Sequence, residues 1–232
     1  MQEITLAKVV SLAVADAVNP CAFAVLTMLL VSIIAYNPRK RSNVIWAGLA
    51  FSTAVFVMYL IYGVFIIKSF QLVQAITWVR PFLYKALGAV AIILGLLQLK
   101  DAFFYKPGSV GTEMPMGWRP TVKGVMGRVT SPWGAFGVGL FVTLFLLPCT
   151  IGPYIILGGM LSFMQIVETL PVLLLYNVIF ISPMLLITLV VYGGLSGVED
   201  VQRWKDRHIR AMHLIAGLLI LGIGVLMIGE WI

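Results

Sequence analysis

Long apolar segments separated by short polar stretches dominate the chain. The segments cover residues 4–35, 44–67, 80–99, 133–163, 169–192 and 211–231. A helix that crosses a hydrocarbon core of about 30 Å needs about 20 apolar residues, and each segment has roughly that length or more. The second, fourth and fifth segments contain no Asp, Glu, Lys or Arg at all. This pattern predicts an all-α membrane protein with six transmembrane helices.

The composition agrees with a lipid environment. Of the 232 residues, 61% are hydrophobic and 11% are charged, whereas a soluble domain carries about 25% charged residues. Such a chain lacks the polar side chains to cover a soluble surface. The net charge of +7 is a feature of nucleic-acid-binding proteins too, but here the basic residues lie in the connections between apolar segments. Membrane topology explains them better.

The basic residues gather in alternate connections. The first, third and fifth connections hold twelve of the sixteen Lys and Arg residues, while the other side keeps only Lys8, Lys68, Arg80 and Lys85. Basic loops stay in the cytoplasm. The sequence therefore predicts a multi-pass protein of the cytoplasmic (inner) membrane with both termini extracytoplasmic. An even number of helices agrees, since it places both termini on the same side.

The third connection, residues 100–132, is the only long one. Its stretch 107–115 is rich in Gly and Pro, which disfavour a helix. We expect a cytoplasmic linker here; a gate or a docking surface is the alternative. Division at this linker leaves two three-helix units, residues 1–99 and 133–232. Because each unit has an odd number of helices, the second enters the membrane upside down, which predicts an inverted repeat.

The chain has two cysteines, and each follows a proline in the first helix of its unit. Pro20 precedes Cys21 in the first apolar segment, and Pro148 precedes Cys149 in the fourth. Because only 11 of 232 residues are Pro, this repetition is unlikely to arise by chance. A proline inside a helix removes a backbone hydrogen bond and clashes with the preceding turn. Helices one and four are therefore predicted to be broken at the Pro-Cys sites.

Broken backbone at membrane depth is tolerated only inside protein or beside a wet cavity, so both sites should face the bundle interior. Asn19 and Pro20 are typical of an N-cap followed by the first residue of a new helix, which places Cys21 in its first turn. At the second site Thr150, Gly152 and Pro153 suit an unwound backbone. Pro20, Pro148, Gly152 and Pro153 are the candidate hinge residues.

Other readings of the cysteines remain open. They could be small packing residues beside kinks, or two thiolates that bind a soft ion such as Cu(I) or Zn(II), although closed zinc sites usually have four ligands. His208 and His213 fall outside the predicted centre of the membrane, and we interpret both as interfacial. We expect no resident metal and no cofactor.

Polar residues within the spans are candidates for lining a cavity or handling protons. Asp16 is the one carboxylate well inside a predicted span, five residues before Cys21, and acids at that depth normally face the bundle interior; an interfacial, solvated Asp16 is the alternative. Asn19, Thr150 and Asn177 complete this set. Asn177 follows Tyr176 in a polar stretch that could line the same cavity or only bond to neighbouring helices.

With these motifs, Asn19-Pro20-Cys21 and Pro148-Cys149-Thr150-Ile151-Gly152-Pro153, the chain resembles the CcdA/DsbD family of transmembrane electron transporters over nearly its whole length. The resemblance implies six helices in two halves. It also implies that reducing equivalents pass from cytoplasmic thioredoxin to extracytoplasmic thioredoxin-like proteins, including those that serve cytochrome c maturation. The redox-active pair, and so the catalytic residues of this oxidoreductase, would be Cys21 and Cys149.

Thiol–disulfide exchange requires direct attack of a thiolate on a disulfide, and a soluble partner cannot reach about 15 Å into hydrocarbon. We therefore expect alternating access, in which broken helices of an inverted repeat expose the site to each face in turn. The Cα atoms of Cys21 and Cys149 should approach within about 7 Å. The alternative function is a metal-ion or small-solute secondary transporter of the same architecture.

Overall fold

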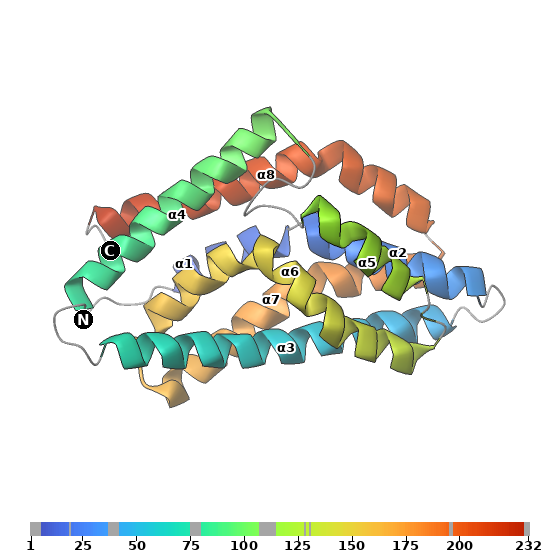
Figure 1. Cartoon of the computed structure of the whole chain (residues 1–232), viewed down its shortest axis with the longest axis horizontal. Coiled ribbons are helices and arrows are strands. Elements are labelled where there is room, and N and C mark those ends of the chain that lie inside the picture. The colour runs from blue at the N-terminus through green and yellow to red at the C-terminus, as the bar shows by residue number, and fades with distance from the viewer. Residues whose placement is uncertain are drawn as a thin grey trace.

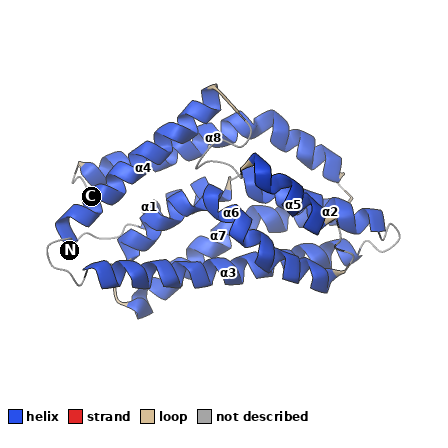
Figure 2. Ribbon diagram, in the orientation of Figure 1, coloured by secondary structure: helices blue, strands red, loops and turns tan. Residues whose placement is uncertain are grey.

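The structure is a computed structural model, and it describes residues 6–18, 20–36, 42–74, 80–106, 115–127, 129, 131–194 and 197–229. Within helices, the backbone alone is described at residues 20, 36, 73, 74, 80, 81, 83, 84, 147–149 and 166. The described part is helical throughout, with short turns and no strand (Figure 2). The all-α prediction is confirmed for these residues.

Seven long or medium helices and one short helical segment make up the fold. They are α1 (Leu6–Ala17), α2 (Pro20–Tyr36), α3 (Ser42–Gln74), α4 (Arg80–Phe103), α6 (Pro132–Leu161), α7 (Ile166–Tyr192) and α8 (Val198–Ile228), with the 3-10 turn η1 (Met116–Trp118) leading into the short helix α5 (Arg119–Met126). Helices dominate because lipid offers no partner for a backbone N–H or C=O, so each segment must satisfy its own.

Four helices, α3, α4, α7 and α8, are each long and apolar enough to cross a membrane. Two further spans are bent pairs. Helix α1 and residues 21–35 of α2 meet at 47°, and the parts of α6 before Leu146 and after Thr150 meet at 83°. The chain therefore has four to six candidate spans, which makes it a multi-pass membrane protein. The bend in α6 is plain in Figure 1.

Three helix pairs form the largest contacts. Helix α4 lies along α8, and α3 packs against both α6 and α7. Helix α1 fills the space between α7, α8 and α6, while α2 contacts α8 and α3. In Figure 1 α1 begins, and α8 ends, at the same end of the bundle, whereas α2 and α7 end, and α3 and α8 begin, at the opposite end.

Glycines bring the α4–α8 pair close together. A Cβ atom added to Gly224 would lie 2.8 Å from the backbone nitrogen of Ile92, and one added to Gly95 would lie 2.8 Å from backbone atoms of Leu221. Small residues at such crossings let two helix backbones approach within van der Waals contact. Gly95 lies four residues after another small residue, Ala91, which is fully buried. The two therefore lie on the same face of α4.

The predicted linker, residues 100–132, holds more structure than its composition indicated. Helix α4 continues to Phe103, and α5 occupies residues 119–126; residues 107–114 of the Gly/Pro-rich stretch lie outside the described part. Val122 and Met126 of α5 are 2% and 1% exposed, and α5 contacts α2 and α6. Val122 and Met126 are four residues apart and therefore lie on the same face of the helix. The burial of this face holds the short helix in place.

Helix α8 begins thirteen residues before the predicted segment 211–231. Its first turns are charged, but Val198, Lys205, Ile209 and Met212 are buried, at the three-, four- and seven-residue spacings of one helix face. The prediction missed residues 198–210 because most of them are polar, although the buried ones lie on a single face of the helix. Arg203, Arg207 and Arg210 of the same turns are exposed.

Candidate functional site

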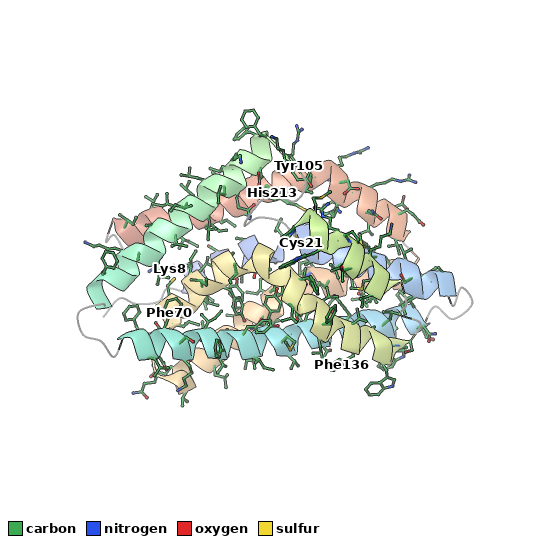
Figure 3. The ribbon with its side chains drawn as sticks, in the orientation of Figure 1. Lys8, Cys21, Phe70, Tyr105, Phe136 and His213 are labelled. Atoms are coloured by element: carbon green, nitrogen blue, oxygen red, sulfur yellow. The ribbon has the colours of Figure 1, made fainter. Side chains whose placement is uncertain are left out.

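Cys21 lies in the first turn of α2, directly after the bend between α1 and α2. Its side chain is buried, with 7% of its surface exposed. Helix α2 begins at Pro20, where a proline needs no hydrogen bond from its nitrogen. Asn19 lies outside the described residues. Figure 3 shows Cys21 near the middle of the bundle and beside α5, while Lys8 of α1 lies nearer the end where the chain begins.

The second cysteine lies within the sharper bend. Residues 147–149 connect the two parts of α6 that meet at 83°. The side chains of Pro148 and Cys149 are outside the described part, so the approach of the two sulfur atoms stays a prediction. Directly after the bend, Thr150, Gly152 and Pro153 are all buried. A Cβ atom on Gly152 would lie 2.7 Å from Leu94, so α6 and α4 approach closely here.

Thr150, the residue after Cys149, is hydrogen-bonded across the bundle. Its hydroxyl oxygen lies 2.6 Å from the hydroxyl of Tyr59 on α3 and 3.2 Å from the carbonyl oxygen of Leu146. Because the Thr150 hydroxyl donates to that carbonyl, Tyr59 is the donor to Thr150. Both side chains are at most 1% exposed. This pair ties the bend of α6 to the straight helix α3.

Tyr154, one turn further along α6, joins three helices. Its hydroxyl donates to the carbonyl oxygen of Tyr59 at 2.6 Å and accepts from the amide nitrogen of Asn177 on α7 at 3.1 Å. The same amide nitrogen also donates to the carbonyl oxygen of Leu173 at 2.9 Å. Asn177 is fully buried. Of the two roles predicted for Asn177, the structure supports bonding to a neighbouring helix.

Asp16 faces the bundle interior, as predicted. It is 1% exposed, and its carboxylate accepts a hydrogen bond of 3.0 Å from the hydroxyl of Tyr176 on α7. The interfacial, solvated reading of Asp16 is therefore wrong. The Tyr176 ring packs edge-on against Tyr154, with ring centroids 5.4 Å apart.

These residues form one buried polar cluster, which consists of Asp16, Tyr59, Thr150, Tyr154, Tyr176 and Asn177. It connects α1, α3, α6 and α7. Its members are at most 3% exposed. The sequence indicated Asp16, Thr150 and Asn177 as candidates but missed Tyr59 and Tyr154. A tyrosine in the middle of an apolar segment was the available signal, because its hydroxyl needs a partner in lipid.

His213, which the sequence predicts to be interfacial, is packed between helices. It is 1% exposed, and its Nδ1 atom lies 2.5 Å from the side-chain oxygen of Gln98 on α4. The ring also packs near Tyr105, with centroids 5.8 Å apart, and Figure 3 shows the two together on the α4–α8 side. These contacts place His213 between α4 and α8, and its interfacial depth in the membrane stays a prediction.

Potential metal ligands do not gather in the described part of the chain, where no three His, Cys, Asp or Glu side chains lie close enough to hold an ion. Comparison with protein-family models, with curated proteins and with solved structures finds no match for the chain. Its function has to be argued from the site alone.

Proposed function

We propose that the chain is a transmembrane electron transporter, a thiol–disulfide oxidoreductase that carries reducing equivalents between the two faces of a membrane. The proposal rests on one observation. Each of the two bends, of 47° and 83°, lies at one of the two cysteines of the chain. Cys21 follows the first bend directly, and Cys149 belongs to the second. A buried cysteine beside an interrupted helix is a place where a moving backbone can open a path to a reactive sulfur.

The packing supports an inverted repeat, with α1–α4 as one unit and α6–α8 as the other. The bent helices of each unit contact the later helices of the other: α6 packs on α3 and α4, while α1 packs on α7 and α8. The last helices of the units, α4 and α8, pack on each other. Exchange of the two units leaves this set of contacts the same, as a pseudo-two-fold axis requires.

The proposed cycle transfers two electrons and two protons. A partner thiolate attacks the Cys21–Cys149 disulfide, so that a partner–cysteine bond forms and the internal bond breaks. The second partner thiolate attacks this mixed disulfide and leaves as an oxidised partner, while the chain keeps two thiols. At the other face the chain reduces an acceptor disulfide by the reverse steps, and its own disulfide forms again.

The charge pattern sets the proposed direction. Basic connections put the α2–α3 and α7–α8 ends and α5 in the cytoplasm, where thioredoxin keeps thiols reduced. Cytoplasmic thioredoxin is then the donor, and extracytoplasmic thioredoxin-like proteins are the acceptors, with cytochrome c maturation as the process served. These partners follow from the resemblance of the two Pro-Cys motifs to the CcdA/DsbD family.

A metal-ion or small-solute secondary transporter is the second candidate. The buried polar cluster favours it, since intramembrane acids often mark a substrate or ion pathway. Under this function the cysteines would be ligands or packing residues. Electron transfer would then be absent from the unaltered protein, and ion binding would be present.

The deciding experiment uses the full chain in lipid vesicles. The oxidised protein is mixed with a thioredoxin that keeps its attacking cysteine and has Ser at its resolving position, which should trap a mixed disulfide visible on a non-reducing gel. Cys21→Ser and Cys149→Ser should each abolish both this adduct and electron transfer to an enclosed disulfide protein. Full transfer by Cys149→Ser would overturn the proposal. Tight binding of Cu(I) or Zn(II) without electron transfer would support the second candidate.

A further inference from the structure

Asp16 is a buried carboxylate that has no role in the exchange steps described above. A charged carboxylate at the bilayer centre is costly, because hydrocarbon does not solvate its charge. Asp16 and Asp101 are the two carboxylates in the described part that are only 1% exposed. Asp101 lies in the last turn of α4, whereas Asp16 lies beside the bend in the first candidate span. A group held there at such a cost calls for a role.

The exchange reaction itself needs a proton acceptor. A thiol attacks a disulfide only as its thiolate, so its proton must go to another group. A thiolate formed alone in a low-dielectric interior would be a new buried charge, which is costly. If the proton passes to a carboxylate that is already buried and charged, the net charge of the site does not change. Asp16 can therefore lower the free-energy cost of forming the thiolate in the absence of water.

The position of Asp16 fits this role. It lies in the last turn of α1 and Cys21 lies in the first turn of α2, with the bend between them. The hydroxyl of Tyr176 donates to one carboxylate oxygen at 3.0 Å, which favours the charged form that accepts a proton. The next polar neighbour, Tyr154, donates to a main-chain carbonyl, so the cluster is not a continuous proton wire. The exchange of a proton is local to Asp16.

We propose that Asp16, held by Tyr176, is the proton-holding group of the thiol–disulfide exchange at Cys21. This inference rests on the proposed function. The Asp16 carboxylate takes the proton from the Cys21 thiol, the thiolate attacks the acceptor disulfide, and the sulfur that leaves the acceptor receives the proton from Asp16. One S–S bond breaks, one forms, and the proton follows the electron pair to the acceptor.

The first test measures the alkylation rate of the remaining thiol in the reduced full chain in nanodiscs. In a Cys149→Ser background, Asp16→Asn keeps a hydrogen-bond acceptor but removes the base, and should slow alkylation of Cys21 on the order of 10²-fold, as loss of a general base does. Asp16→Glu should restore much of the rate. The control Thr188→Val removes another buried hydroxyl, which bonds only within α7, and should leave the rate unchanged.

The other cysteine distinguishes a general structural effect of Asp16→Asn from the loss of the base at Cys21. In a Cys21→Ser background, Asp16→Asn should change the alkylation of Cys149 much less; equal slowing of both thiols would overturn the inference. A second measurement needs no variant that could misfold. Time-resolved infrared spectra of the unaltered protein, recorded while it reduces an acceptor disulfide, should contain a transient carboxyl C=O band, and Asp16→Asn should remove it.

The outcomes also separate this inference from the proposed function. Electron transfer that persists in Asp16→Asn at the unaltered rate, with no carboxyl change in the infrared spectrum, would overturn the role of Asp16 and leave the electron transporter standing. Loss of the mixed-disulfide adduct from the unaltered protein would overturn the function itself.

Discussion

The hydroxyl of Tyr59 on α3 lies 2.6 Å from the hydroxyl of Thr150, the first residue after the 83° bend in α6. The two residues are 91 positions apart in the chain. Tyr59 also contacts the rings of Tyr154 and Phe180, with centroids 5.5 and 4.8 Å away. A straight helix thus holds the residue next to Cys149 by a directional bond rather than by apolar packing alone.

We expect the pair Tyr59 and Thr150 to be energetically coupled. Tyr59→Phe and Thr150→Val each remove one hydroxyl and keep the shape of the side chain. Hydrogen bonds between membrane helices contribute about 0.6 kcal/mol on average and up to about 1.7, so the double variant should be less destabilised than the sum of the single variants by about that amount. Unfolding in mixed detergent micelles measures it, and strict additivity would show that the bond contributes nothing.

The α4–α8 contact should depend on Gly224. Gly224→Ala places a methyl group 2.8 Å from the backbone nitrogen of Ile92, and overpacking of this kind typically costs about 1–3 kcal/mol. The matched control is Gly222→Ala on the same helix, where a Cβ would meet nothing within 4 Å. Thermal unfolding in nanodiscs should show a lower midpoint for Gly224→Ala and an unchanged or slightly higher one for Gly222→Ala. Equal midpoints would contradict the close crossing.

Helix α5 should detach when its buried face is charged. Met126→Asp puts a carboxylate where the side chain is 1% exposed, while the control Thr121→Asp changes an exposed position of the same helix. The measurement is the rate of trypsin cleavage after Lys123, which is exposed. We expect cleavage to rise at least about tenfold in Met126→Asp, since each 1.4 kcal/mol of local destabilisation is about a factor of 10. A rate equal to that of Thr121→Asp would mean that α5 is not held by this face.

The position of α5 matters for the proposed function because it contacts both cysteine-bearing helices, α2 and α6. Just before α5, Trp118 packs edge-on against Phe145, with ring centroids 5.3 Å apart. Phe145 precedes the bend of α6 by two residues. The linker helix therefore lies across the two bent spans on the side that the basic residues assign to the cytoplasm.

Part of the candidate site could be predicted from the sequence, and part of it could not. For Asp16 the sequence left two positions open, the bundle interior and the solvated interface, and the burial of its side chain decides for the interior. Tyr176 and Asn177 were noted as polar neighbours, but their partners were not foreseen. Tyr59 and Tyr154 were missed because an aromatic residue in an apolar segment looks the same whether it faces lipid or another helix.

The sequence by itself determined where most of the helices lie. Long apolar runs must be helical in lipid because the backbone has no other hydrogen-bond partner there, and Pro20 and Pro132 start α2 and α6 because their missing N–H costs nothing at a first turn. Only the tertiary structure decided which polar groups meet. Asp16 with Tyr176, Tyr59 with Thr150 and His213 with Gln98 are each joined over more than ninety residues. Such contacts depend on how each helix is rotated against its neighbours, which no local pattern encodes.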